Sequence, residues 1–389
     1  MYNHNLIPAN RVACKQLSSL PKHDTMWDLC MAPDDTLYIG ACVEHTGGMT
    51  AVLCSYHRSD DRIKYLADMA DVTGESPDSG HATQGKIHFT LNHNPNDGCI
   101  YGATHCTTAP KGEEVWSPFT MYCDPVREYP GGHLFVHNPK TRETRGLGIL
   151  IPNEGIRVMV LDPVRNLLHG TTYPKNHYFI YDLARKKLED VGRIGSVHQL
   201  ALMIDQEGNG FTTDSFGRIL RCDTETHRLS MTGAQLPHAP FRRGEGNYLL
   251  QAVRQPGTDI FYGATYCVDA RLFRYDLKTN EMTDLGLPYG FAYKPNVLAH
   301  TYAGGMTFGK DGYLYYTIGE PKPEMNDGHI IRYDTRTRTA EDLGIMGEGP
   351  LKFYGNSCHA KTDSQGNIYI APNSGIPLRF FIYQPEKKE

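Results

Sequence analysis

Short apolar stretches separated by turn residues follow one another along the whole chain, in an order that repeats. A clear copy, Leu249 to Gly286, reads LLQAVRQPGTDIFYGATYC and then RLFRYDLKTNEMTDLG. Alternating apolar and polar positions predict β-strands, and the Asp, Asn and Gly residues between them predict tight turns. Each copy therefore predicts four short strands in succession. Helical spacing of apolar residues is weak throughout, so we expect an all-β chain.

Seven copies of this unit cover the sequence. They lie at Trp27–Met69, Ile87–Gly148, Ile156–Gly192, Leu200–Leu229, Leu249–Gly286, Ala303–Gly344 and from Cys358 to the end. Units of roughly 40–60 residues with four strands each are typical of the blades of a β-propeller. A β-sandwich is the alternative for many short strands, but seven similar units argue against it.

The last copy lacks its fourth strand, and an extended stretch precedes the first copy. This stretch, Val12 to Leu17, can supply the missing strand and cover an otherwise exposed sheet edge. We therefore predict a single domain over residues 1–389, a seven-bladed β-propeller whose last blade is closed by the N-terminal strand.

Chemically active side chains collect at one end of the predicted strands. In a blade with strands a, b, c and d, the d-to-a and b-to-c loops open on the same face. Residues at these positions include His23, His81, His88, His105, Arg157, Tyr173, His198, Tyr248, Tyr266 and His300. The opposite turns, such as NDG, DQEGN and KDG, have an ordinary turn composition. We therefore expect a functional site on the histidine-rich face.

Four of these residues form the candidate catalytic set: His88, His105, Tyr173 and Arg193. Histidine and tyrosine can exchange protons with a substrate, and arginine can bind a carboxylate with two hydrogen bonds. This combination suits β-elimination from a uronic acid. Arg157, His198 and Tyr248 are the candidate substrate-binding residues. In the alternative interpretation, the histidines are structural hydrogen bonders, the tyrosines pack, and Arg193 caps a turn.

A second cluster comes from the last three predicted blades. It consists of Cys267, His300, Cys358 and His359. Thiolates and imidazoles are ligands that Zn²⁺ prefers, so we predict a zinc ion that holds these blades together rather than one that performs chemistry. Unrelated buried residues are the alternative. No sequence feature indicates an organic cofactor.

Three short motifs carry a resemblance to a known family: KIHF…YGATHC (Lys86 to Cys106), GTTYP (ending at Pro174) and DVGRIG (Asp190 to Gly195). With them the chain resembles the seven-bladed propeller polysaccharide lyases of the ulvan-lyase type. The resemblance implies cleavage next to a uronic acid, often beside a rhamnose. It also implies that His88, His105, Tyr173 and Arg193 form the active site, and that the second cluster binds a structural metal.

Composition narrows the partners. The formal charge of −5 and the absence of a basic block argue against general nucleic-acid binding, and no apolar run is long enough to span a bilayer. The N-terminal residues show no signal peptide, which favours a cytoplasmic protein, although an exported protein without its leader would look the same. Ten cysteines without a CxxC spacing argue against a zinc ribbon. Oligomeric state leaves no trace in the sequence.

Three functions fit these observations. The first is a lyase acting on an anionic carbohydrate, a polysaccharide or oligosaccharide that contains a uronic acid. The second is a propeller glycoside hydrolase, or a rhamnosyl-uronate lyase of another family, that uses one histidine of the same face. The third is a non-catalytic propeller that binds a glycan or a protein, since a fold by itself does not fix a function.

Overall fold

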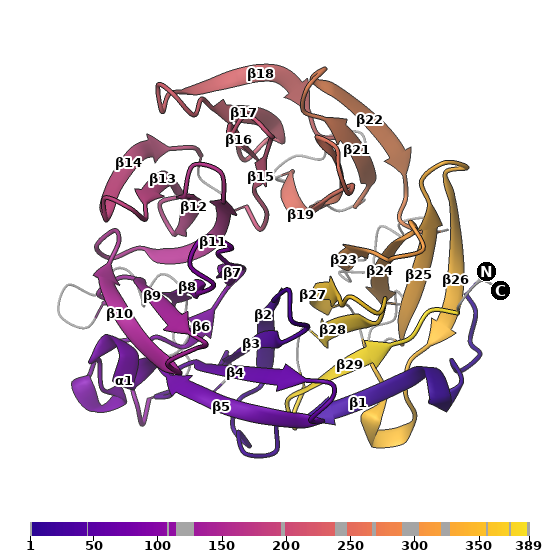
Figure 1. Cartoon of the computed structure of the whole chain (residues 1–389), viewed down its shortest axis with the longest axis horizontal. Helices are drawn as coiled ribbons and strands as arrows, with labels where there is room; N and C mark the ends of the chain where they lie inside the picture. The colour runs from indigo at the N-terminus through magenta and orange to yellow at the C-terminus, as the bar shows by residue number, and fades with distance from the viewer. Residues whose placement is uncertain are drawn as a thin grey trace. The chain divides into compact units, whose positions relative to one another are not determined.

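The computed structural model describes residues 2–44, 46–106, 109–113, 128–195, 199–237, 247–266, 270–289, 303–319, 327–354, 357–372 and 375–386. In this part of the chain the strands form seven antiparallel sheets. They are the blades of a seven-bladed β-propeller, as the repeat predicts (Figure 1). The chain divides into two compact units, residues 17–198 with 374–378, and residues 1–16 with 199–373 and 379–389.

The first unit holds three blades, each a sheet whose strands follow one another in chain order. The first blade is β2 (Thr25–Met31), β3 (Leu37–Cys42), β4 (Val52–His57) and β5 (Arg62–Asp68), followed by the short helix α1 (Met69–Thr73). The second is β6 (Lys86–Ile87), β7 (Asn92–His93), β8 (Ile100–His105), β9 (His133–Asn138) and β10 (Glu143–Ile149). The third is β11 (Gly155–Asp162), β12 (Leu167–Tyr173), β13 (His177–Asp182) and β14 (Lys187–Arg193).

The other unit holds four blades. The fourth blade is β15 (Met203–Ile204), β16 (Gly210–Thr213), β17 (Arg218–Cys222) and β18 (Leu229–Gln235). The fifth is β19 (Tyr248–Arg254), β20 (Ile260–Tyr266), β21 (Leu272–Asp276) and β22 (Glu281–Gly286). The sixth is β23 (Gly304–Phe308), β24 (Leu314–Gly319), β25 (Gly328–Asp334) and β26 (Thr339–Ile345). The seventh is β27 (Ser357–Thr362), β28 (Ile368–Pro372), β29 (Arg379–Tyr383) and β1 (Val12–Gln16).

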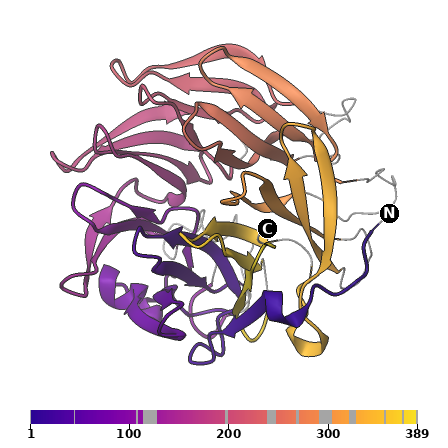
Figure 2. The same ribbon diagram turned by 45° about the vertical axis from the view of Figure 1, so that its right-hand side comes forward.

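The N-terminal segment closes the last blade, as predicted from its position in the sequence. Strand β1 pairs antiparallel with β29, from Val12 opposite Tyr383 to Gln16 opposite Arg379. Before β1, the chain runs along β26, where Ile7 N donates to Ile345 O and Ile345 N donates to Asn5 O. Figures 1 and 2 show this indigo segment passing the orange β26 before it reaches the yellow β29. The segment therefore joins the sixth and seventh blades.

Alternation along the strands sets the core. Every residue of β3 and β24 is buried, whereas the outer strands β5, β14 and β18 contain exposed and partly buried positions and no buried one. An outer strand has one face on the blade and the other in solvent, so only alternate side chains can be covered. Because the middles of the inner strands are buried, functional side chains on these strands are expected at their ends.

Candidate functional site

Strand ends of the second and third blades bring the first predicted cluster together. His105 is the last residue of β8 and Tyr173 is the last residue of β12. Gly155, the first residue of β11, lies opposite Tyr173 in the register of the two strands, and Arg157 follows two positions later. A β-carbon placed on Gly155 would lie 1.9 Å from Nδ1 of His105. Glycine at this position is therefore what lets the His105 ring sit against β11.

Arg157 connects the two aromatic rings. Its Nη1 donates to Nε2 of His105 over 3.1 Å, and its guanidinium carbon lies 5.5 Å from the centre of the Tyr173 ring. The rings of His105 and Tyr173 meet edge to face at 5.7 Å. Because a guanidinium can only donate, the Nε2 of His105 must accept and the proton of the neutral ring sits on Nδ1.

His88 lies behind this group and is fully buried. Its Nδ1 is 2.8 Å from the carbonyl oxygen of Arg157, which can only accept, so Nδ1 carries the proton. Its Nε2 has no hydrogen-bond partner among the described residues. Burial, followed by the charges of Arg157 and Lys86, holds the pKa of His88 well below its usual value. His88 is thus a neutral imidazole that offers a lone pair from Nε2.

The backbone around His88 departs from a regular strand. The inner strand of this blade is split into β6 and β7, and Phe89 in the gap has a φ of +41°. A bulky side chain rarely adopts a positive φ, and such strain gathers at functional sites. The buried carboxylate of Asp28 accepts from the N–H groups of Thr90 and Leu91, both at 2.5 Å, and so holds the irregular segment in place.

Sequence reasoning missed a buried charged group that is connected to His88 through Trp27. Lys86 is 1% exposed, and its Nζ lies 2.7 Å from Oε1 of Glu44 and 4.3 Å from the centre of the Trp27 ring. Trp27 in turn stacks on the His88 ring at 4.6 Å, with an angle of 18° between the planes. The signal was present in the sequence, because a lysine flanks the apolar IHF stretch where a buried strand is expected.

Tyr173 is positioned from the other side by Glu154. This carboxylate is 1% exposed, and its Oε2 accepts from the hydroxyl of Thr172 over 2.8 Å and from the N–H of Lys175 over 3.0 Å. Both donors flank Tyr173, so the strand end that carries the phenol is fixed. Burial raises the pKa of Tyr173, and the charge of Arg157 opposes this. The phenol is therefore protonated at neutral pH.

The structure does not bring Arg193 into this group. Arg193 ends the outer strand β14, is exposed, and donates from Nε to the carbonyl of Lys175 over 3.0 Å. Arg157, predicted for substrate binding, takes the place beside the two histidines. Tyr248 belongs to the other unit, where it is buried and stacks on Tyr266 at 4.7 Å. His198 lies outside the described residues.

The zinc site stays a prediction. Cys267 and His300 lie outside the described residues, whereas Cys358 and His359 are neighbours on β27, the first buried and the second partly buried. Cys358 sits at a register shift between β27 and β28. Over the residues described, no group of three or more histidine, cysteine and acidic side chains has the geometry to hold a metal ion.

Access to solvent divides the first cluster into two layers. Arg157 and Tyr173 are partly exposed, while His88 and His105 are 0% and 1% exposed. A ligand therefore meets the guanidinium and the phenol first. With Lys86 paired to Glu44, Arg157 supplies the net positive charge, so the group suits a ligand that carries one carboxylate.

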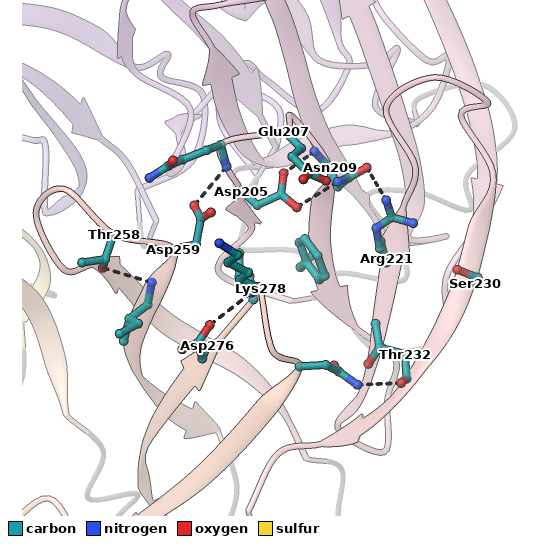
Figure 3. A pocket seen from close by; sticks show the side chains of 15 residues that line it. Asp205, Glu207, Asn209, Arg221, Ser230, Thr232, Thr258, Asp259, Asp276 and Lys278 are labelled. Atoms are coloured by element: carbon teal, nitrogen blue, oxygen red, sulfur yellow. Dashed lines mark hydrogen bonds between the residues drawn. The ribbon is translucent and has the colours of Figure 1, made fainter.

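A separate cavity of about 620 Å³ lies in the other unit, at the turns of the fourth and fifth blades (Figure 3). Its lining mixes acidic, basic, amide and hydroxyl groups with the apolar side chains of Phe211, Ile260 and Leu277. Most of its carboxylates are held by turns: Asp205 accepts from Asn209, and Asp259 accepts from the N–H of Gln206. Lys278 is exposed and points into this cavity in the close-up.

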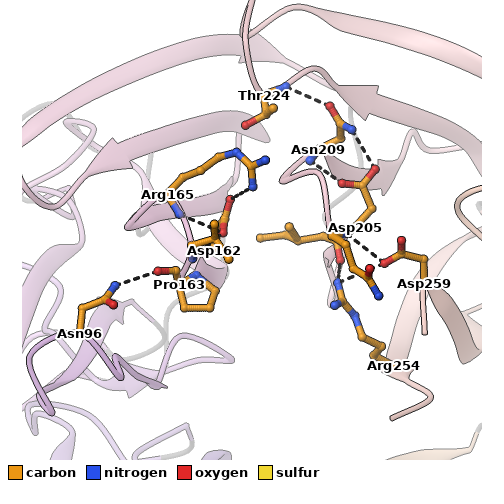
Figure 4. Close-up of polar contacts among 12 residues, drawn as sticks. Asn96, Asp162, Pro163, Arg165, Asp205, Asn209, Thr224, Arg254 and Asp259 are labelled. Carbon is orange, nitrogen blue, oxygen red and sulfur yellow. Dashed lines mark hydrogen bonds and ion pairs between the residues drawn. The ribbon is translucent and has the colours of Figure 1, made fainter. Parts of the chain in front are cut away.

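Figure 4 draws polar contacts in these turns and in a turn of the third blade. Asn209 is the centre of one network: its Oδ1 accepts from Arg221 over 2.8 Å and from the N–H of Thr224 over 3.1 Å. In the third blade, Asp162 accepts from the N–H groups of its own turn and binds Arg165 at 3.0 Å. These contacts are the turn chemistry expected of Asp and Asn, so they stabilise the scaffold.

Similarity to solved structures supports the fold and no more. The extracellular domain of the one-component system BT4673 from B. thetaiotaomicron aligns with 98% of the chain at 12% identity and a TM-score of 0.61. A catalytically inactive virginiamycin B lyase from Staphylococcus aureus, solved with quinupristin, aligns with 96% of the chain and all of its own length, at 11% identity and a TM-score of 0.59. U3-55K aligns with 97% of the chain and 99% of its own, at 8% identity and 0.60.

The chain spans about 40% of the length of the one-component system structure. No protein-family model and no curated protein matches the sequence. Within the part that is described, none of the helices has the length and apolar character needed to cross a membrane.

Proposed function

We propose that the protein is a carbohydrate lyase that cleaves a glycosidic bond next to a uronic acid by β-elimination. The observation that carries the proposal is the contact group of Arg157, Tyr173 and His105, with His88 behind it. Elimination needs a cation on the carboxylate, a proton acceptor for C5 and a proton donor for the leaving oxygen. All three types of group are present within this one cluster.

Arg157 is the residue that would bind the carboxylate, because it is the partly exposed cation of the group. Pairing with the guanidinium reduces the negative charge next to C5 and makes the C5 proton more acidic. The base takes this proton, a double bond forms between C4 and C5, and the C4–O4 bond breaks. The departing oxygen takes up a proton, so the products are an unsaturated uronate and a free hydroxyl.

Tyr173 is the proton donor in this proposal, since burial keeps its phenol protonated at neutral pH. The acceptor belongs to the imidazole pair, and His105 is the nearer one to Tyr173. A carboxylate that takes over the Arg157 N–H releases Nε2 of His105, whose lone pair then becomes free to accept a proton. Binding must therefore shift the guanidinium before the proton moves.

The test is the ultraviolet absorbance of unsaturated uronates, recorded while the protein is incubated with a panel of polysaccharides and oligosaccharides that contain uronic acids, including ulvan. An increase in absorbance on one of them is expected, and it names the substrate. A flat trace on the whole panel, from protein shown to be folded and supplied with zinc, contradicts the proposal.

A second function, glycan binding without catalysis, is favoured by the cavity of the fourth and fifth blades. Its lining of mixed polar groups together with apolar side chains suits a hydroxyl-rich ligand. Calorimetry with the same panel tests it: Lys278→Ala should weaken binding, while Arg336→Ala, at the corresponding turn of the sixth blade, should not. Equal binding by wild type and both variants excludes this cavity as the site.

A further inference from the structure

Lys86 is an unusual residue to find inside a sheet. Its ammonium is buried with a side-chain exposure of 2%, and the Glu44 carboxylate that binds it is 30% exposed. Burial lowers the pKa of Lys86, and the Glu44 charge opposes this. Burying an ion costs free energy unless the ion is paired and hydrogen-bonded. The neighbours of Lys86 therefore indicate why it is buried.

Those neighbours lead directly to His88. Lys86 opens β6, and His88 follows that strand two positions later, where the inner strand of the blade is interrupted. The indole of Trp27 contacts both side chains: its ring centre lies 4.3 Å from Lys86 Nζ and 4.6 Å from the centre of the His88 ring, on which it stacks. Trp27 Nε1 donates to the second oxygen of Glu44 over 3.2 Å. One carboxylate therefore fixes both the ammonium and the indole.

We propose that Trp27, Lys86 and Glu44 form a positioning unit that keeps His88 neutral and oriented, with its proton on Nδ1 and the lone pair of Nε2 available. The indole face sets the plane of the imidazole, and the Arg157 carbonyl selects the tautomer. The ammonium of Lys86 disfavours a second positive charge beside it. Glu44 holds the ammonium and the indole in one arrangement.

The other groups that face His88 act in the same direction or lie farther along the chain. Arg157, on β11, also disfavours protonation of the imidazole, as does His105 on β8. The carboxylate of Asp28, on β2, accepts hydrogen bonds from the N–H groups of Thr90 and Leu91. Glu44 is a second carboxylate near His88, and it pairs with Lys86. Lys86 is thus the cation whose removal changes the charge balance around His88 without touching the Arg157 guanidinium.

The role given to His88 rests on the proposed function, but the state of its ring can be measured without a substrate. Histidine labelled with ¹⁵N reports which ring nitrogen carries the proton, and the signal of His88 is the one lost in His88→Asn. In the wild type this signal should show a neutral ring protonated on Nδ1 from pH 8 to pH 5. In Lys86→Met the share of the protonated ring at pH 5 should increase, because a charge that lowers the His88 pKa is gone while burial and Arg157 remain.

The matched control is Lys64→Met. Lys64 also pairs with a carboxylate, Asp60 at 2.9 Å, but at the surface, so its loss should leave the His88 signal unchanged. If Lys86→Met does not fold because Glu44 is left unpaired, the double variant Glu44→Gln with Lys86→Met removes both charges together. A wild-type ring protonated on Nε2 overturns the proposal. So does a His88 signal in folded Lys86→Met, or in the double variant, that stays identical to the wild type.

Turnover gives an independent reading. On a uronate substrate, the kcat of Lys86→Met should fall several-fold more than that of the wild type between pH 8 and pH 5.5. If the wild type turns over none of the uronates, the proposed function is wrong. The NMR measurement of the His88 ring then tests the positioning unit by itself.

Discussion

Tyr173 and Arg157 reach solvent, whereas the two histidines beside them are covered. This difference indicates that the phenol and the guanidinium contact the substrate directly. An imidazole accepts a proton only after the ligand has displaced Arg157. The buried carboxylate of Glu154 holds the strand end that carries Tyr173 by accepting from Thr172 and Lys175. Removing the hydroxyl should therefore affect chemistry more than folding.

Tyr173→Phe should abolish turnover while changing the free energy of unfolding by less than about 1 kcal/mol, as expected for a partly exposed side chain that keeps its ring. The absorbance assay measures the first effect and thermal unfolding the second. Activity that survives together with a large loss of stability would show that Tyr173 serves packing.

Arg157→Ala should lower kcat/KM by about 100-fold or more, because it removes the charge proposed to bind the carboxylate and one hydrogen-bond donor to His105. Arg193→Ala is the comparison. Since Arg193 is exposed and bonded to the carbonyl of Lys175, its loss should have a small effect. If the two variants behave in the opposite way, Arg193 is the carboxylate-binding arginine and the contact with His105 is structural.

The choice between these two arginines shows how far the sequence leads. Strand-end reasoning placed His88, His105 and Tyr173 together because an end of an inner strand is defined by the repeat itself. It could not separate an arginine near the start of the inner strand β11 from one at the end of the outer strand β14, since both positions open on the same face. Lys86 escaped notice because its purpose depends on Glu44 and Trp27, which are far from it in the sequence.

Among the elements, the N-terminal strand β1 has a distinct role because it completes a blade begun at the other end of the chain. The alternation predicted its location, Val12 to Leu17, within one residue of the observed Val12–Gln16. What the sequence did not reveal is the earlier contact of residues 5–7 with β26, since a parallel pairing of three residues leaves no periodic pattern. The closing segment therefore stabilises two blades.

Proline substitutions test the closure. Gln384 N donates to Arg11 O, so residues 11, 13 and 15 face β29 with their backbone hydrogen-bonding groups in the antiparallel register, and residues 12, 14 and 16 face away. Lys15→Pro removes a ladder bond and should lower the free energy of unfolding by about 1–3 kcal/mol. Gln16→Pro should cost less. Thermal unfolding compares them, and equal losses would contradict the register.

On the scale of the whole molecule, the stability of the chain should depend on pH through its buried imidazoles. Among the described residues, His23, His88 and His137 have a pKa below the ordinary value of 6.5 in the folded chain, in each case chiefly because burial disfavours the charged ring. The unfolded chain binds protons at these sites once the pH falls below about 6.5, while the folded chain does not yet do so. Acidification therefore favours the unfolded state.

The midpoint of thermal unfolding should accordingly fall from about pH 6.5 toward pH 5, each such histidine contributing up to about 1.4 kcal/mol per pH unit. The dependence should flatten in His88→Asn, because that ring has the most strongly lowered pKa of the three. If the midpoint falls equally in His88→Asn and in the wild type, the folded chain does not disfavour the charged form of His88, and its lone pair is not kept available for a proton.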